Sequence, residues 1–328
     1  MGIGARYWEA ERPVLLAPMS GVTDTPFRRL ARRFGATMVV TEMVASERYA
    51  AGHHEELRKS DEDTPGAPYV MQLAGCSPPW MREAAIRAEA EGASVIDINM
   101  GCPAKRVVGG YGGSALMRDL DLASELIARV AEAVSLPVTV KMRLGWDDRS
   151  LNAPELARRA EGLGAKALSV HGRTRCQFYK GRADWRRVAD VVDAVRIPVL
   201  VNGDILGAAD AAEALRLSGA AGVMVGRAAI GQPWLLGAIV DDLAGRAPPH
   251  IPIEIRKAAM AEHLDGSIEA YGPRLGLLNF RKHLAAYLTH IGVARSDVSA
   301  ACVKEDAAAV RDLIWQLPAN EDGLREAA

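Results

Sequence analysis

The sequence predicts an α/β protein: a (β/α)8 TIM barrel with a C-terminal all-helical domain. Two observations carry this prediction. Short apolar runs alternate with helical patterns over residues 14–243, and helical periodicity with almost no strand signal follows from about residue 253. Eight apolar runs separated by helices fit the strand count of a barrel. A doubly wound parallel sheet is the structural alternative.

The predicted strands are short runs rich in Val, Ile, Leu and Met. Such near-continuous apolar runs are typical of parallel strands that are covered on both faces. The predicted strands are 14–19, 38–43, 69–73, 95–100, 138–143, 167–171, 199–202 and 222–225. The helical patterns between them are 25–34, 79–91, 120–134, 153–163, 185–195 and 208–217.

A change of composition suggests a domain boundary. Residues 241–252 include Gly245, Pro248, Pro249 and Pro252, as linkers often do. We therefore predict a barrel domain at 1–243, a helical domain at 253–317 and a flexible tail at 318–328.

The composition excludes several classes of protein. An apolar content of 49% supports a sizeable core, and a net charge of −1 gives no global attraction to nucleic acid or membranes. The four cysteines are scattered without a C-x-x-C pair, so neither a disulfide framework nor a metal site is indicated. The N-terminus does not read as a signal peptide, and no apolar stretch approaches the ~18 residues of a membrane span. We expect a cytoplasmic monomer without metal or membrane contact.

Cys102 follows the fourth predicted strand. The apolar run ends at Asn99, and the cysteine comes next in a Gly/Pro turn. The thiol is therefore expected on a loop at the carboxyl end of a strand, where barrels carry their chemistry. The alternative is a small buried hydrophobe, because free cysteine is among the most buried residue types.

The other predicted strands also end in residues that are unusual for a buried strand, and in a barrel these residues would meet at one face. They are Pro18, Met19, Ser20, Glu42, Gln72, Lys141, Arg143, His171, Asn202, Gly203, Asp204, Gly226 and Arg227. The last five follow strands seven and eight, where barrels commonly bind phosphate through backbone N–H groups. Turn geometry is the alternative explanation for the two glycines.

Lys141 lies inside an apolar run. Strand alternation puts Thr139 and Lys141 on one face and Val138 and Val140 on the other. An ammonium that points into a barrel mouth is costly unless an anion or an electron-rich ring pairs with it. We therefore expect Lys141 to face a ligand.

A basic segment follows the sixth predicted strand. Residues 171–187 have a net charge of +5, with Phe178, Tyr179 and Trp185 between the cations. Clustered cations with interleaved aromatic rings are typical of RNA-binding surfaces. The alternative is an ordinary solvated loop and helix face.

Together these motifs resemble the tRNA-dihydrouridine synthase family, and the bacterial B-type enzymes most. The hallmark is the run from Ile96 to Pro103, with Val107, Gly113 and Ser114 downstream. Supporting motifs lie at 17–24, 141–143, 171–175, 202–204 and 226–227. The similarity runs from about residue 14 to residue 232 and shows no departure at any catalytic position.

The resemblance implies an FMN-dependent barrel that reduces the C5=C6 double bond of selected uridines in tRNA, with NADPH or NADH as the electron donor. It implies that Cys102 donates a proton and that Asn99 positions the uracil. It assigns the flavin to Pro18, Met19, Ser20, Gln72, Lys141, His171, Asn202, Gly203, Asp204, Gly226 and Arg227.

For the tRNA partner we predict contacts with the basic segment and with the helical domain. The predicted contacts in the barrel are Arg143, Arg173, Arg175, Lys180 and Arg182. The helical domain is expected to orient tRNA by shape, through Arg281, Lys282 and His283 on one helix.

Several alternatives stay open. A thiol is mostly protonated near neutral pH and can act as an acid, whereas a nucleophilic Cys102 would need a nearby cation such as Lys105 or Arg106. An FMN barrel could instead reduce a free pyrimidine, as dihydroorotate dehydrogenases do. A redox-silent phosphate-binding barrel and a non-catalytic RNA-binding protein are further alternatives.

Overall fold

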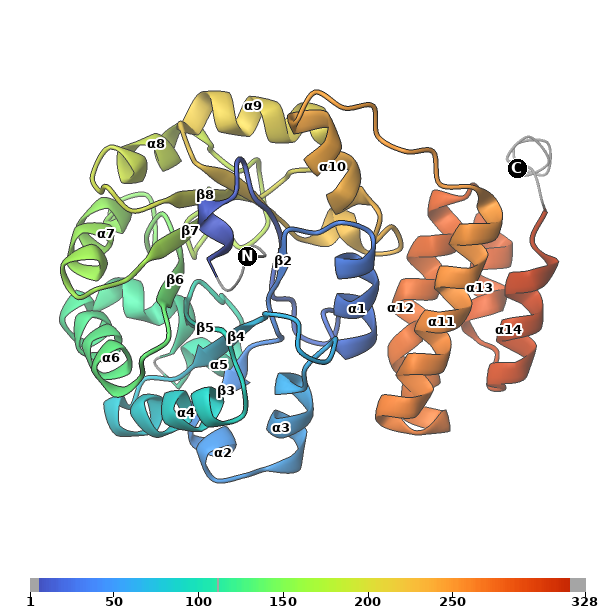
Figure 1. Ribbon diagram of the computed structural model, residues 1–328, viewed down its shortest axis with the longest axis horizontal. Helices are drawn as coiled ribbons and strands as arrows, with labels where there is room; N and C mark the ends of the chain where they lie inside the picture. Colours follow the sequence, from blue (N-terminus) through green and yellow to red (C-terminus); the bar gives the residue numbers. More distant parts are fainter. Residues whose placement is uncertain (1–5, 111, 319–328) are drawn as a thin grey trace.

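The computed structural model describes residues 6–110 and 112–318, and it contains a parallel barrel surrounded by helices (Figure 1). The strands are β1 (Val14–Leu16), β2 (Met38–Val39), β3 (Val44–Ala45), β4 (Val70–Ala74), β5 (Val95–Met100), β6 (Val138–Arg143), β7 (Ala167–His171), β8 (Val199–Asn202) and β9 (Gly222–Val225). They pair in the order β2-β1-β9-β8-β7-β6-β5-β4-β3. The predicted barrel is confirmed.

The predicted single strand 38–43 is wrong in its extent, because only Met38 and Val39 of this segment form a strand, β2, and β3 begins beyond it at Val44. Val40 still bridges to Val70, and the Thr41 N–H donates to the Val70 carbonyl at 2.9 Å, so the two ends of the sheet meet. The chain then leaves the ladder at Glu42, whose carboxylate accepts the N–H of Gly21. The first predicted strand likewise ends early, at Leu16, and a turn follows.

Helices surround the barrel where the pattern predicts them. The six predicted helices are α1 (Thr25–Arg33), α4 (Pro78–Ala90), α6 (Leu120–Ala133), α7 (Ala153–Gly162), α8 (Arg186–Val192) and α9 (Ala208–Ser218). The structure adds α2 (Ser46–Ala50), α3 (His54–Ser60), α5 (Lys105–Val108) and α10 (Leu235–Leu243), with 3-10 turns η1 (Tyr7–Glu9), η2 (Gly113–Arg118) and η3 (Arg227–Ala229).

Strand alternation gives the barrel two apolar layers. Val14 and Leu16 of β1 pack outward against the helices, whereas Leu15 points into the barrel. Tyr7 from η1 packs with Leu15 and is 2% exposed. The barrel interior is therefore a packed core, and only the carboxyl end of the strands is left for a ligand.

The C-terminal region is all-helical, as predicted, and packs beside α1 (Figure 1). Its helices are α11 (Ile253–Tyr271), α12 (Pro273–His290), α13 (Arg295–Cys302) and α14 (Ala307–Gln316), around their own apolar core. Residues 246–252 hold no helix or strand, and the domain boundaries stay a prediction. Of the predicted tail, only Pro318 lies among the described residues. No helix within residues 6–110 and 112–318 has the length and apolar character of a membrane span.

Candidate active site

The carboxyl ends of the strands surround a cavity of about 890 Å³. A cavity of this volume accommodates a cofactor-sized ligand. Cys102, Asn99 and Arg143 line it, together with the residues predicted to hold the flavin: Pro18, Met19, Ser20, Gln72, Lys141, His171, Asn202, Gly203, Asp204, Gly226 and Arg227. The fold therefore brings together side chains from both ends of the barrel sequence.

A chain of hydrogen bonds runs beneath the cavity. The buried Asp97 carboxylate accepts hydrogen bonds from Thr139 Oγ1 and Gln72 Nε2, both at 2.7 Å. The Gln72 carbonyl in turn accepts from Asn99 Nδ2 at 2.7 Å, and Asn99 Oδ1 accepts from the Cys102 N–H at 2.9 Å. These hydrogen bonds fix the orientation of the Gln72 and Asn99 side chains. Asp97 is a site residue that the sequence motifs did not predict, although its place in β5, two residues before Asn99, was a usable signal.

The loop that carries Cys102 is held from both sides. The Ser114 hydroxyl and N–H donate to the Cys102 carbonyl at 2.9 and 3.1 Å. Gly113 has φ +57°, and a Cβ at this position would lie 2.8 Å from that carbonyl. The thiol itself is partly exposed and lines the cavity. Its backbone is therefore fixed by contacts that do not involve the sulfur.

Two cations of β6 interact electrostatically with Cys102. They are Lys141 and Arg143, which both line the cavity. Lys141 Nζ donates to Asn202 Oδ1 at 3.2 Å. Burial lowers the pKa of Lys141 to about 8, helped by the charge of Arg143 and opposed by Asp97 and Cys102. A lysine with a lowered pKa at a cavity wall is a typical mark of a functional site.

We expect the ligand-free Lys141→Met variant to unfold a few degrees above the ligand-free wild type at pH 7. Burial disfavours the ammonium, and unfolding restores its hydration. As pH rises from about 8 toward the ordinary value of 10.5, the folded chain releases this proton before the unfolded chain does, so the gain shrinks. Thermal melts at pH 7 and pH 9.5 measure the difference. A variant that is less stable than wild type at pH 7 would contradict this account.

In the part of the chain that the structure describes, backbone N–H groups after β8 and β9 form a cluster of unpaired donors, which we call the anion-binding cradle because such donors suit an anion. Within the described residues, no protein acceptor pairs with the N–H groups of Gly203, Asp204, Gly226, Arg227 and Ala228, and all five residues line the cavity. Gly203 has φ +112°, and a Cβ there would lie 2.9 Å from Ala183 and 3.0 Å from His171. Such a group of free N–H donors at the start of η3 fits a phosphate.

Asp204 links the cradle to two arginines. Its carboxylate accepts from Arg173 Nη2 at 2.5 Å and from the Ala183 N–H at 2.7 Å, and Arg227 Nη2 lies at 3.6 Å. Burial alone would raise the pKa of Asp204, but these donors and charges outweigh burial and lower it. A carboxylate repels phosphate, so the Asp204 side chain can serve the cradle only by orienting the arginines.

His171 is neutral at physiological pH. Burial lowers its pKa well below 6.5, and the charges of Arg143, Lys141 and Arg173 lower it further. Its imidazole therefore offers a hydrogen bond rather than a charge to a ligand in the cavity.

Two arginines predicted to contact tRNA are buried. Arg173 is 1% exposed and donates to the Lys180 and Gly181 carbonyls as well as to Asp204. Arg143 is 2% exposed, and its guanidinium donates to the backbone carbonyls of three residues, Gly101, Thr174 and Phe178. The structure therefore gives both side chains intramolecular partners that brace the loop after β7. Their predicted contact with tRNA stays untested.

The other predicted tRNA-binding cations are more accessible. Arg175 is half-buried, with its guanidinium 4.6 Å from the ring centres of both Trp146 and Phe178. Lys180 and Arg182 are exposed in the same loop. Of the five predicted tRNA contacts in the barrel, Lys180 and Arg182 are the two that the structure leaves exposed.

Fold and site together define a barrel that can hold a phosphate-bearing ligand, with a thiol and the cations Lys141, Arg143 and Arg227 at the cavity wall. The family described as Dihydrouridine synthase (Dus) matches residues 15–313 of the sequence. The chain belongs to this family.

Curated relatives agree with this assignment over most of their length. A "Probable tRNA-dihydrouridine synthase" of Rickettsia conorii is 47% identical over 310 residues, or 93% of each chain. One of Rhodobacter capsulatus is 53% identical, covering 84% of this chain and 86% of its own. A "tRNA-dihydrouridine synthase B" of Xanthomonas axonopodis pv. citri is 44% identical, covering 84% of this chain and 83% of its own. The resemblance read from the motifs is confirmed.

Proposed function

We propose that this protein is an oxidoreductase that reduces the C5=C6 double bond of specific uridines in tRNA to 5,6-dihydrouridine. FMN is the proposed cofactor, and NADPH or NADH is the proposed electron donor. One observation carries the proposal: the anion-binding cradle, Lys141 and Cys102 all line the same cavity. The chain also belongs to the dihydrouridine synthase family. We place the reaction in the cytoplasm, where tRNA is abundant.

The polar and apolar groups that line the cavity match the phosphate and the ring of FMN. The cradle after β8 and β9 would take the phosphate, and Arg227 would add a charge-assisted contact. Gln72 and Lys141 would bind polar edges of the ring, while Pro18 and Met19 would give it an apolar surface. When bound, FMN supplies the hydride that reduces the uracil.

Cys102 has the proposed role of general acid. When C6 of the uracil accepts a hydride, the electron pair of the double bond moves to C5, which then needs a proton. The Cys102 thiol can give this proton, and solvent returns one to the thiolate. Lys141 and Arg143 would stabilise the thiolate that remains. Asn99 holds the Cys102 backbone and would position the uracil.

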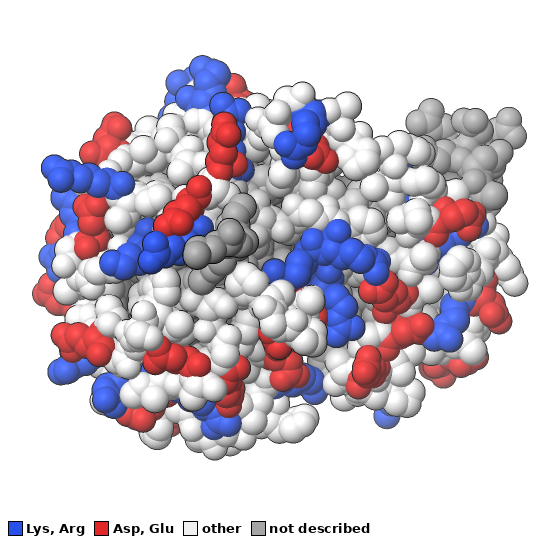
Figure 2. Space-filling model, viewed as in Figure 1, with Lys and Arg blue, Asp and Glu red and all other residues white. Residues whose placement is uncertain are grey.

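The proposed tRNA-binding surface is local. Basic and acidic side chains are interspersed over most of the face that Figure 2 shows, in keeping with a net charge of −1. Lys180 and Arg182 lie in the loop after β7 and therefore at the same end of the barrel as the cavity. A uridine would have to leave the tRNA stack to reach the thiol.

We expect the double reversal Lys180→Glu/Arg182→Glu to weaken tRNA binding and to flatten its dependence on salt. Fewer counterions are released when fewer phosphates are neutralised, so the slope of log K against log salt should fall by roughly one to two. Binding titrations at several salt concentrations measure this. NADPH oxidation without RNA should not change, because neither residue lines the cavity.

The matched control is Lys166→Glu/Arg196→Glu, which makes the same change of charge at the opposite end of the barrel. Both residues are exposed and precede β7 and β8. If the salt dependence of tRNA binding were unchanged in Lys180→Glu/Arg182→Glu, or if the control lost as much tRNA affinity, the tRNA site would lie away from the loop after β7.

One assay separates this function from its rivals. The purified protein should be yellow, and NADPH-reduced enzyme should be reoxidised by unmodified tRNA but not by uracil or orotate. Reoxidation by a free pyrimidine would favour the alternative barrel reductase. Protein that neither carries nor binds flavin would favour the redox-silent barrel.

A further inference from the structure

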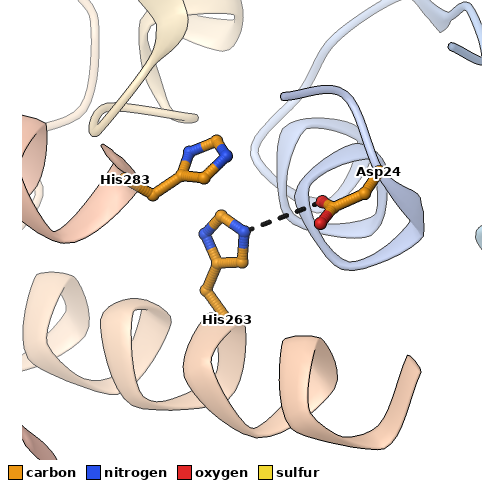
Figure 3. A group of neighbouring side chains, drawn as sticks. All are labelled: Asp24, His263 and His283. Atoms are coloured by element: carbon orange, nitrogen blue, oxygen red, sulfur yellow. Dashed lines mark ion pairs between the residues drawn. The ribbon is translucent and has the colours of Figure 1, made fainter. Parts of the chain in front are cut away.

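Three side chains from separate elements meet where the C-terminal helices pack against the barrel (Figure 3). Asp24 caps the start of α1, His263 belongs to α11 and His283 to α12. Their exposed fractions are 5%, 0% and 1%. The atoms that each could offer to a metal ion lie within 4.8 Å of one another.

Ring nitrogens in this cluster lack partners. Tyr287 Oη lies 3.2 Å from His263 Nδ1, but His263 Nε2 has no hydrogen bond and faces Asp24 Oδ1 at 3.8 Å. That separation is too long for a hydrogen bond. Neither nitrogen of His283 makes a hydrogen bond of ordinary geometry among the described residues, although the Val22 backbone lies close enough to interact with the ring. Buried polar atoms without partners are costly, so a missing occupant is the simplest explanation.

The surroundings exclude water from most sides. The Phe27 ring lies 5.5 Å from the His263 ring and 4.8 Å from the His283 ring, and Phe280 closes a further side at 5.2 Å from His263. The two imidazoles are themselves 4.4 Å apart. Because these walls are apolar, the imidazole nitrogens and the Asp24 carboxylate are the groups that can bind a ligand in the cluster.

Other polar groups border the cluster without filling it. Arg28 and Glu42 interact electrostatically with Asp24, and Lys282 and the Val22 backbone face His283. Lys282 Nζ is held by the Gly21 carbonyl, and Arg28 Nη1 by the Thr23 carbonyl at 2.6 Å. Neither cation donates a hydrogen bond to Asp24.

We propose that Asp24, His263 and His283 bind one divalent transition-metal ion, with Zn²⁺ the best fit. Zinc takes imidazole nitrogen and carboxylate oxygen at about 2.0–2.2 Å, which puts tetrahedral ligand atoms about 3.3–3.4 Å apart. The 3.8 Å between His263 Nε2 and Asp24 Oδ1 needs only a small contraction. A fourth position is left for water or for the second oxygen of Asp24.

Tyr287 supports this assignment. A histidine that binds a metal through one nitrogen usually donates a hydrogen bond from the other. With its proton on Nδ1, His263 donates to Tyr287 Oη, and the lone pair on Nε2 points toward the carboxylate. A cation between these two acceptors removes their repulsion. The ion would tie α1 to α11 and α12, which is a structural role separate from the proposed redox chemistry.

The test is the metal content of the full chain. Protein incubated with Zn²⁺ and dialysed should retain about one zinc per chain, and Asp24→Asn and His283→Gln should each lose most of it. His290→Gln is the matched control for metal content, because His290 lies on the same helix but outside the cluster, with its Nε2 3.2 Å from the Ile230 carbonyl. Far-UV circular dichroism shows whether each variant is folded.

A second readout does not depend on the variants. Co²⁺ in place of zinc should give the visible absorption of a tetrahedral site, and removal of metal by a chelator should lower the melting temperature of the wild type by a few degrees. Wild-type protein that retains no zinc and gives no cobalt spectrum overturns the proposal. So does zinc retained equally by the His283→Gln variant and the control.

Discussion

The Cys102→Ala variant is expected to keep its flavin and to oxidise NADPH while forming dihydrouridine about 10²–10⁴-fold more slowly than wild type, the range typical of a lost general acid. Hydride transfer from NADPH to the flavin needs no acid at C5 of the uracil, whereas product formation does. The loop should survive the substitution, because Asn99 and Ser114 hold Cys102 through its backbone. Single-turnover reduction of tRNA by pre-reduced enzyme measures the step.

Cys176→Ala is the matched control for this experiment, because Cys176 is an exposed free cysteine that does not line the cavity. It should reduce tRNA at the wild-type rate. Single-turnover rates that are equal in Cys102→Ala and wild type would remove Cys102 from the mechanism, whatever the steady-state rates.

Substitution of Gly203 is expected to abolish cofactor binding. At φ +112° an alanine is strained, and its Cβ would come within 2.9 Å of Ala183 and 3.0 Å of His171. The Gly203→Ala variant must therefore shift the loop that supplies the Gly203 and Asp204 N–H groups of the anion-binding cradle. We expect it to purify nearly colourless, with FMN affinity reduced at least about 100-fold, since several charge-assisted hydrogen bonds are displaced together.

Gly207→Ala is the control for Gly203→Ala. Gly207 follows in the same connection, has an extended backbone with φ −171°, and its added Cβ would meet nothing within 4 Å. Flavin absorbance per chain and circular dichroism compare the two proteins. Full flavin occupancy in Gly203→Ala would place the phosphate elsewhere in the cavity.

Much of this site could be predicted from the sequence because a barrel gathers the ends of its strands. Asn202 and Gly226 are far from Cys102 along the chain, yet one rule about parallel strands puts all three around one cavity. Lys141 faces inward because side chains alternate along a strand, and its hydrogen bond to Asn202 agrees with that alternation.

Other features depend on packing that no local pattern reveals. Arg173 is a charged residue of a type usually found at the surface, but hydrogen bonds to Asp204 and to the Gly181 carbonyl keep its side chain buried. The second strand ends at Val39, and Glu42 beyond it accepts the N–H of Gly21 from another loop. The intramolecular partners of these side chains come from other loops, so spacing along the chain could not show them.

His283, predicted to face tRNA, is 1% exposed, so its side chain lies inside the helical packing and the predicted contact stays untested. Its neighbours on α12 have intramolecular partners too: Arg281 donates to the Lys304 carbonyl at 2.9 Å, and Lys282 to the Gly21 carbonyl. The proposed metal cluster could not be predicted from the sequence either, because it also depends on contacts between separate elements. Its ligands are distant along the chain and meet only when α11 and α12 pack against α1.

The proposed activity is tested most directly by the dihydrouridine content of tRNA from a strain that lacks this protein, treated with the purified enzyme and NADPH. The account predicts that tRNA from this strain has unmodified uridine at defined positions, and that the enzyme adds two hydrogen atoms at those positions. The Cys102→Ala protein should restore almost none of this modification. Identical dihydrouridine maps with and without the protein, and no gain on treatment, would contradict the account.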